Sequence, residues 1–173
     1  MTRLNKDFYT KNALEIAPLL IGKLLVRRYD KGVVEKYRIK EIEVYNGTED
    51  TACHARVGKT KRTETLFKEG GITYVYLCYG VYYLLNIVTG EKDHPEAILI
   101  RGIEGYDGPG KLTKALNITK ELHEINLTTS DKLWIEDDEY KAKYMKASRV
   151  GIEYATKKYR DIKWRYILKR KGD

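Results

Sequence analysis

The stretch ITYVYLCYGVYYLLNIV, residues 72–88, decides the fold expected for this chain. Its first part, from Ile72 to Tyr79, is rich in β-branched and aromatic residues, which favour β-strands. Gly80 interrupts this pattern, and the apolar run of residues 81–88 predicts a second strand directly after it. The middle of the chain is therefore expected to form two consecutive strands.

Shorter patterns on both sides of this stretch predict two helices and further strands. Apolar residues at helical spacing indicate a helix over residues 11–20, with Thr10 as its N-cap and Pro18 bending or shortening it. Gly108-Pro109-Gly110 introduces a second helix. Further strands are expected at residues 24–26, 33–45, 97–101, 133–136 and 164–168. The sequence predicts a mixed α and β domain whose strands are mainly antiparallel.

Length and composition are those of a globular chain. Of 173 residues, 42% are hydrophobic and 34% are charged, so enough apolar surface exists to form a packed core. There is no internal repeat, low-complexity tract or Pro/Gly/Ser linker, and we expect a single domain over residues 1–173. Cys53 and Cys78 are the only cysteines, and no secretory segment precedes them. We expect a cytoplasmic protein, associated with the nucleoid if its source is prokaryotic.

The charge balance favours an anionic partner. Lys and Arg total 33 against 25 Asp and Glu, a net charge of +8. Residues 51–67 are polar and basic and are expected to form a loop or short helix. The lysines and arginines of this segment are candidates for contacts with the phosphates of a nucleic acid. They are Arg56, Lys59, Lys61 and Arg62.

One carboxylate in the strand over residues 33–45 has an unusual setting. Alternation places Tyr37, Ile39, Glu41, Glu43 and Tyr45 on one face of that strand. Glu43 lies between two apolar residues in the sequence, so its carboxylate is a candidate general base in a mostly apolar pocket. The alternative is a solvated edge glutamate paired with a lysine.

Tyrosines and one asparagine mark residues 72–88 as a candidate binding surface. Tyr74 and Tyr76 share one face, Tyr79 lies on the other, and tyrosine rings next to a basic loop can stack on nucleobases. The alternative is a tyrosine-rich core with its hydroxyls at the rim. Asn86 interrupts an apolar run, so its amide is either a structural hydrogen-bonding group or a reader of a polar ligand.

Other chemistries have little support in the sequence. Cys53, His54, Cys78, His94 and His123 show neither CxxC nor HExxH spacing, so we expect no metal site and no cofactor. A serine hydrolase is not indicated, because the sequence has no nucleophile elbow. The segment from Gly108 to Lys111 is too short for a phosphate-binding P-loop. It offers either a plain turn and helix cap or, through Lys111, a contact with one phosphate.

Six segments, in order along the chain, together resemble the alkyladenine (3-methyladenine) DNA glycosylase family. Their order and their span over most of the chain make the resemblance more specific than any single motif. The segments are LIGKLLVRR (residues 20–28), EIEVY (41–45) with DTACHA (50–55), YVYLCYGVY (74–82) with Asn86, ILIR (98–101), GPGKL (108–112) and RVGI (149–152).

The resemblance implies a fold and a set of site residues. It implies an α+β domain built on a curved, mainly antiparallel sheet, a partly open barrel with flanking helices and no helix-hairpin-helix. Glu43 would be the general base, and Arg101 would position the attacking water. The implied DNA-contacting groups are Tyr45, His54 and Tyr76 around the flipped base, Tyr79 filling the gap in the duplex, and Asn86 excluding the 2-amino group of guanine.

The resemblance also implies an activity. The enzyme would flip alkylated or deaminated purines out of duplex DNA and hydrolyse the N-glycosidic bond in base excision repair. The expected substrates are 3-methyladenine, 7-methylguanine, hypoxanthine and ethenoadenine. A single carboxylate acting on water predicts an abasic site without strand cleavage. We expect a monomer that acts on damaged double-stranded DNA with no membrane and no obligate protein partner.

Three positions depart from the family pattern, and one other class of function remains. Thr63 replaces a usual Asn, Gly70 replaces a usual Pro, and the segment from Arg101 to Gly108 is much shorter than usual. The competing class is a non-catalytic nucleic-acid-binding module that uses the same basic loop and tyrosines. It leaves the settings of Glu43 and Asn86 unexplained.

Overall fold

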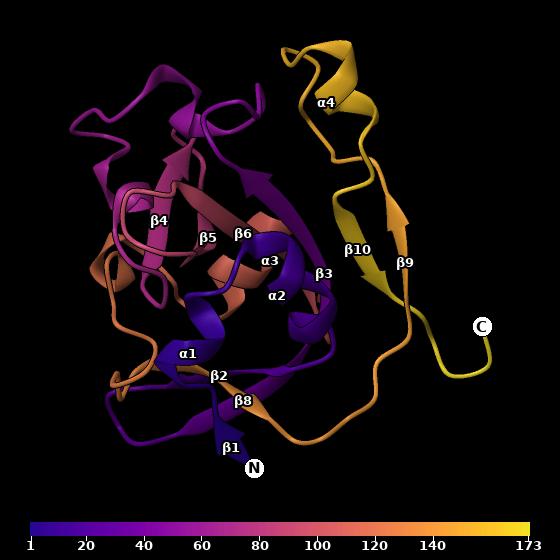
Figure 1. Ribbon diagram of the computed structural model, residues 1–173. Coiled ribbons are helices and arrows are strands. Elements are labelled where there is room, and N and C mark those ends of the chain that lie inside the picture. Colours follow the sequence, from indigo (N-terminus) through magenta and orange to yellow (C-terminus); the bar gives the residue numbers. More distant parts are fainter.

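The computed structural model describes residues 1–173, and its strands join in one sheet that does not close into a barrel (Figure 1). The main path of the sheet is β1-β8-β2-β3-β6-β5-β4, and each pairing is antiparallel. The mixed α+β class and the antiparallel sheet are confirmed. The strands are β1 (Thr2–Arg3), β2 (Leu24–Arg28), β3 (Val34–Asn46), β4 (Thr73–Cys78), β5 (Tyr82–Thr89), β6 (Glu96–Ile103), β7 (Tyr106–Asp107), β8 (Leu133–Asp137), β9 (Tyr144–Ala147) and β10 (Arg165–Leu168).

Four short helices and three 3₁₀ turns accompany the sheet. The helix expected over residues 11–20 begins later, at Ala13, because the Asn12 side chain accepts a hydrogen bond from Leu14 N. Thr10 is therefore not its N-cap, and instead ends the preceding helix. The helices are α1 (Lys6–Tyr9), α2 (Ala13–Leu20), α3 (Pro109–Ala115) and α4 (Lys157–Asp161), and the 3₁₀ turns are η1 (His54–Val57), η2 (Glu64–Phe67) and η3 (Lys120–Leu122).

An irregularity in β3 changes which of its side chains reach the core. The register against β6 shifts between Ile39 and Glu41 and again between Glu41 and Ile42. Ile39 therefore joins Ile42 and Val44 in the core, and the prediction that it shares a face with Glu43 is wrong. A β-bulge inserts an extra residue and so reverses the alternation on one side of it.

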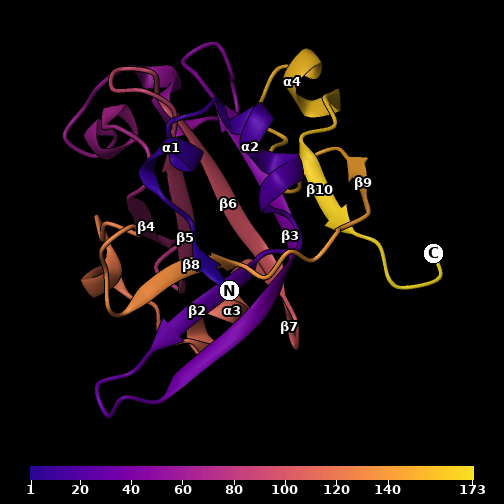
Figure 2. The same ribbon diagram turned by 60° about the horizontal axis from the view of Figure 1, so that its bottom comes forward.

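Beyond this irregularity, β3 and β6 present two different faces. Ile42 and Val44 lie opposite Ile100 and Ile98 and pack in the main core, against which α2 lies (Figure 2). Glu43 and its register partner Leu99 point to the other face, as does Tyr45. One face of this strand pair thus builds the core, and the other faces a cleft.

The two strands expected from residues 72–88 are β4 and β5, which form a hairpin. At its tip Tyr79 and Gly80 have positive φ angles of 50° and 67°, and Val81 N donates to Cys78 O. A left-handed conformation is unfavourable for a tyrosine. This turn leaves the Tyr79 side chain 92% exposed, beyond the end of the sheet.

The C-terminal arm, residues 141–173, contains a hairpin of β9 and β10, of which only β10 was predicted from the sequence. β10 pairs with both β3 and β9 and so attaches the arm to the edge of the strand that carries Glu43. Neither β9 nor α4 was predicted from the sequence. In Figure 1 the arm lies along one side of the molecule, with α4 at one end and the C-terminus projecting from the other.

None of the helices combines the length and the apolar character that a membrane span requires.

Candidate active site

A cleft of about 620 Å³ opens on the face of the sheet that carries Glu43. Its walls come from β3, η1 and the loop after it, the β4–β5 hairpin, β6 and the arm. Seven of the residues singled out in the sequence line it together. They are Tyr45, His54, Arg56, Arg62, Tyr76, Tyr79 and Arg101.

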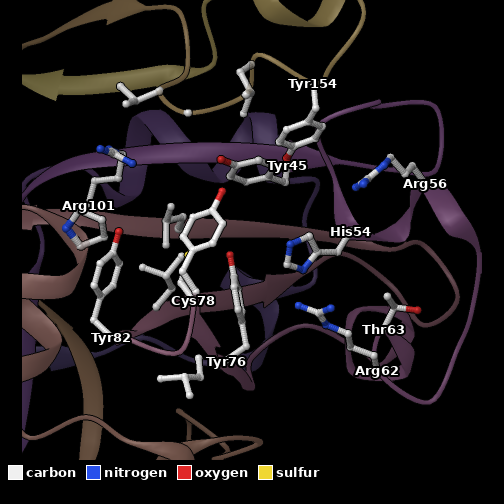
Figure 3. A pocket seen from close by; sticks show the side chains of 18 of the residues that line it. Tyr45, His54, Arg56, Arg62, Thr63, Tyr76, Cys78, Tyr82, Arg101 and Tyr154 are labelled. Atoms are coloured by element: carbon white, nitrogen blue, oxygen red, sulfur yellow. The ribbon is translucent and has the colours of Figure 1, made fainter.

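Aromatic rings form the two sides of the cleft. The ring centroids of His54 and Tyr76 lie 4.8 Å apart, and those of Tyr74 and Tyr76 lie 5.2 Å apart. Figure 3 shows Tyr45 on the other side, facing His54 and Tyr76. His54 and Tyr76 are too close together to admit a planar ring between them. A planar ligand would therefore stack between this pair and Tyr45.

His54 is held neutral by its surroundings. Burial lowers the pKa of its imidazole to about 4, and the nearby Arg62 and Arg56 act in the same direction. Its Nδ1 lies 3.1 Å from the hydroxyl of Tyr74, which fixes the ring orientation. A neutral ring at this position exerts no charge repulsion on a cationic ligand.

Glu43 lies behind the cleft wall with no exposed surface. Its Oε1 accepts a hydrogen bond from the Tyr45 hydroxyl at 2.9 Å, and its Oε2 accepts one from Val150 N at 2.6 Å. The guanidinium of Arg101 lies 3.6 Å from Oε1. The alternative of a solvated edge glutamate paired with a lysine is wrong, because the side chain is buried and its charged neighbour is an arginine.

The protonation of Glu43 reflects two opposing influences. Burial raises the pKa of the carboxyl, because the charged form loses its hydration. Arg101 lowers the pKa, as do the hydrogen bonds from Val150 and Tyr45, and their effect is smaller than that of burial. A carboxylate with a raised pKa binds a proton more readily than an ordinary glutamate, as a general base requires.

Arg101 is shared between two carboxylates. Its Nε donates to Glu41 Oε2 at 2.9 Å, while Nη1 faces Glu43. Arg165 lies 3.7 Å from the same oxygen of Glu41. Glu41 thus holds the guanidinium of Arg101 between itself and the buried carboxylate.

A buried ion pair, which the sequence analysis did not assign, joins the arm to the loop after β3. Arg149 donates through Nη1 and Nη2 to the two oxygens of Asp50 at 2.7 and 2.9 Å, and both side chains are fully buried. Nη1 also donates to Val44 O. The residue after Arg149 supplies the amide that binds Glu43. Both residues lie in segments that carry the family resemblance, which was the only sequence signal for them.

Asn86 is buried in the sheet beside the cleft. Its amide nitrogen donates to Tyr74 O at 3.2 Å, so it has a structural hydrogen bond. It also lines a small cavity of about 50 Å³ that adjoins the cleft and shares Tyr45, His54 and Tyr76 with it. The position is compatible with both roles considered for this residue.

The remaining predicted residues lie outside the cleft. Lys59 and Lys61 are exposed on the loop after η1 and do not line the cavity. Lys111 lines a neighbouring groove of about 670 Å³, which shares Tyr82 and Pro109 with the cleft. No group of three His, Cys, Asp or Glu side chains is arranged to hold a metal ion.

Comparison with known proteins decides the family. The sequence pattern of the methylpurine-DNA glycosylase family matches residues 7–107 and 106–172. The chain belongs to the methylpurine-DNA glycosylase family. The two matched segments meet at β7, where the short connection from Arg101 to Gly108 turns β6 directly toward α3.

Curated relatives match this glycosylase over nearly its whole length, each named as a candidate 3-methyladenine DNA glycosylase. The relative from Sodalis glossinidius is 42% identical over 172 residues, covering 95% of this chain and 96% of its own. The relative from Clostridium perfringens strain 13 is 38% identical over 198 residues, covering 96% of each chain. The relative from Borreliella burgdorferi strain ZS7 is 35% identical over 179 residues, also covering 96% of each. The family is one of hydrolases that act on DNA in base excision repair.

Proposed function

We propose that this glycosylase removes alkylated and deaminated purines from duplex DNA by direct hydrolysis. The proposed substrates are 3-methyladenine, 7-methylguanine, hypoxanthine and ethenoadenine, and the proposed active form is a monomer in the cytoplasm. The observation that carries the proposal is the buried carboxylate of Glu43, held by Tyr45, Val150 and Arg101 directly behind an aromatic cleft.

The cleft suits a purine that has left the base stack. A base must be extruded before its glycosidic bond is reached, and damaged or mispaired bases are the easiest to extrude. Tyr45 on one side, with His54 and Tyr76 on the other, offers ring faces on which a flipped purine stacks. Alkylated purines such as 3-methyladenine are cationic, so the electron-rich faces of the tyrosines attract them. The neutral His54 does not oppose that charge.

The chemistry follows from the position of Glu43. Its carboxylate takes a proton from a water molecule as the water oxygen forms a bond to the sugar C1′. The N-glycosidic bond breaks, and its electron pair leaves with the base. This neutralises a cationic purine, whereas hypoxanthine and ethenoadenine leave as anions and take a proton from the solvent. Arg101 stabilises the carboxylate and orients the water. The products are the free base and a sugar that carries a hydroxyl at C1′.

Strand cleavage is not part of the proposed reaction. A glycosylase that also cleaves the strand uses an amine to form a covalent link with C1′. None of the residues that line the cleft is a lysine. The amines of Lys59, Lys61 and Lys111 lie outside it, where they suit contacts with phosphates.

Two further residues are proposed to act on the duplex and on base choice. Tyr79, exposed at the hairpin tip, fills the space left by the flipped nucleotide. Asn86 occupies the space that the 2-amino group of guanine would need and so disfavours this normal base. Adenine and hypoxanthine lack that group. 7-Methylguanine carries it, but its cationic base leaves far more readily than neutral guanine, which offsets the penalty.

A gel assay tests the proposal. Duplexes that carry one hypoxanthine, one ethenoadenine or one 7-methylguanine are incubated with the enzyme, and half of each sample is treated with alkali. We expect strand breaks only after alkali, which reveals abasic sites. Breaks without alkali, or a covalent complex trapped by borohydride, would contradict direct hydrolysis. The absence of abasic sites in all three duplexes would contradict the proposed activity and favour the non-catalytic module.

A further inference from the structure

The positive charge of the chain is concentrated in the C-terminal arm. Residues 141–173 contain 12 Lys and Arg against 3 Asp and Glu, whereas residues 1–140 contain 21 against 22. The arm thus carries a net charge of +9, and the remainder carries −1. Only Arg149, Lys157 and Arg165 of the arm form ion pairs. The other nine cations are free to attract an external polyanion.

The end of the arm that contains α4 is fixed against the rim of the cleft. Val150 and Tyr154 line the cleft, and α4 begins three residues after Tyr154. Thr156 N donates to Thr51 Oγ1 at 2.9 Å, and Arg149 donates to Tyr159 O at 3.1 Å. The first of these bonds joins the residue before α4 to the loop after β3, and the second holds α4 itself. The arm is therefore a built part of the cleft rim, as Figure 3 shows at its upper edge.

Three cations at this end of the arm face solvent without a counter-ion. Lys158, Arg160 and Lys163 are exposed, and none forms an ion pair. On the other side of Tyr154 stands the basic segment that begins with η1, whose Arg56 guanidinium lies 5.1 Å from the Tyr154 ring centroid. Two basic segments thus flank the same opening, one from the middle of the chain and one from its end.

We propose that α4 and Lys163 form a second contact surface for the phosphates of duplex DNA, across the cleft from the basic loop. This inference rests on the proposed function, because an enzyme that flips a nucleotide into the cleft must hold the duplex on both sides of that cleft. Phosphate contacts supply most of the non-specific affinity for DNA and fix its register, while reading no sequence. The arm, which carries +9 against −1 for the rest of the chain, supplies the larger share of that attraction and directs the duplex to the cleft.

The salt dependence of binding tests the proposal. The triple variant K158Q/R160Q/K163Q is compared with the matched control R28Q/K31Q/K132Q, which removes three exposed, unpaired cations around the β2–β3 turn, far from α4 (Figure 2). Binding of each to an undamaged 20-base-pair duplex is measured by fluorescence anisotropy between 50 and 200 mM KCl. Each lost phosphate contact lowers the log–log slope by about 0.9, so we expect the arm variant to lose roughly 2–3 units.

The control distinguishes a local contact from a general effect of charge. Both variants change the net charge equally, and we expect the control to keep the wild-type slope within about half a unit. Equal slopes for the two variants would overturn the proposal. The double variant K158R/K163R keeps the charge and should keep the wild-type slope. If it too loses slope, distortion of the arm rather than loss of charge is responsible, and the proposal is again overturned.

The outcomes also separate this inference from the proposed function. Excision by the wild-type enzyme is measured in the alkali assay on the same protein preparation. If the enzyme excises lesions while the arm variant binds like the control, the arm inference alone fails. If the arm variant alone loses slope while the wild-type enzyme excises nothing, the arm binds nucleic acid and the proposed chemistry fails.

Discussion

Two glutamates are buried on the neighbouring strands β3 and β6, and only one of them lies beside the cleft. Glu43 has no exposed surface and Glu96 is 5% exposed. Burial raises the pKa of both carboxyls. Glu96 shares the α2 face of the sheet with its register partner Asn46, whereas Glu43 points to the opposite face. Burial and a raised pKa therefore do not by themselves identify a catalytic group.

The neighbours of the two carboxylates explain the difference. Glu96 accepts hydrogen bonds from Ala13 N at 2.6 Å, Asn12 Nδ2 at 2.9 Å and the Thr89 hydroxyl at 3.0 Å. These neutral donors tie the start of α2 to the sheet, and a carboxylate at the N-terminus of a helix is stabilising. Glu43 instead has a guanidinium beside it and aromatic side chains in front of it. The same residue type is thus a helix anchor on one face and a candidate base on the other.

Replacing Glu43 by Gln should have the largest effect on excision. An amide cannot accept a proton from water, and loss of a general base costs roughly 10²–10⁴-fold in rate. Binding to a lesion duplex should be largely kept, because the side chain lies behind the cleft wall. Single-turnover excision and anisotropy measure the two effects. A variant that retains more than about a tenth of the wild-type rate would place the base elsewhere.

Replacing Glu96 by Gln is the matched change on the other face and should lower stability instead. In Gln an NH₂ group replaces one carboxylate oxygen. This new donor then faces at least one of the three groups that now donate hydrogen bonds to Glu96. Such a loss costs about 1–3 kcal/mol of unfolding free energy. Urea denaturation measures it, and excision at 25 °C should stay within about twofold of wild type. A large loss of excision in a folded Glu96→Gln protein would break the distinction between the two glutamates.

Replacing Asn86 by Ser should change base choice more than rate. The shorter side chain leaves room for the 2-amino group of guanine and removes an exclusion of about 1–2 kcal/mol, so excision of mispaired guanine relative to hypoxanthine should rise roughly tenfold. The hydrogen bond to Tyr74 O gives a structural alternative. That alternative predicts a lower melting temperature and an equal loss on every lesion. An unchanged ratio in a destabilised protein would reject the selective role.

Replacing Arg101 by Gln should shift the pH dependence of excision. Arg101 lowers the pKa of Glu43, so its removal raises that pKa further. The base is inactive when protonated, and the rate falls as pH falls through the pKa. The acid limb of the single-turnover rate should therefore move to higher pH. Because 7-methylguanine is already cationic and needs no acid to leave, a duplex carrying it isolates this limb. A limb that stays in place or moves to lower pH would show that Arg101 does not act on the base.

Local patterns predicted the elements that have a clear apolar face. The β-branched and aromatic residues of β4 and β5 gave both strands, and the alternation near the end of β3 correctly placed Glu43 beside Tyr45. The segment KKYRD that forms α4 has no buried residue, so it carries no helical apolar pattern. In β9 the larger side chains Tyr144 and Met145 point to opposite faces, so the sequence shows no alternation of apolar and polar residues that would predict a strand.

The contacts that set the chemistry of Glu43 lie too far apart in the chain to be read from local patterns. Val150 N reaches Glu43 across 107 positions, and Arg149 reaches Asp50 across 99. The bulge in β3 depends on its register with β6. The family resemblance named the segments that hold these residues, and only the folded chain shows how they meet. The resemblance implied roles for Glu43, Arg101 and Asn86, which stay predictions until the variants are measured.

The central claim is that the carboxylate of Glu43 is the base whose protonation controls excision. The most direct test compares two pH titrations of the wild-type enzyme: the ¹³Cδ chemical shift of Glu43, assigned by its loss in Glu43→Gln, and the single-turnover excision of 7-methylguanine. We expect one common midpoint, above the ordinary pKa of a glutamate, with the rate falling as the carboxyl becomes protonated. A rate midpoint that differs from the Glu43 titration and follows that of Glu96 would contradict the claim.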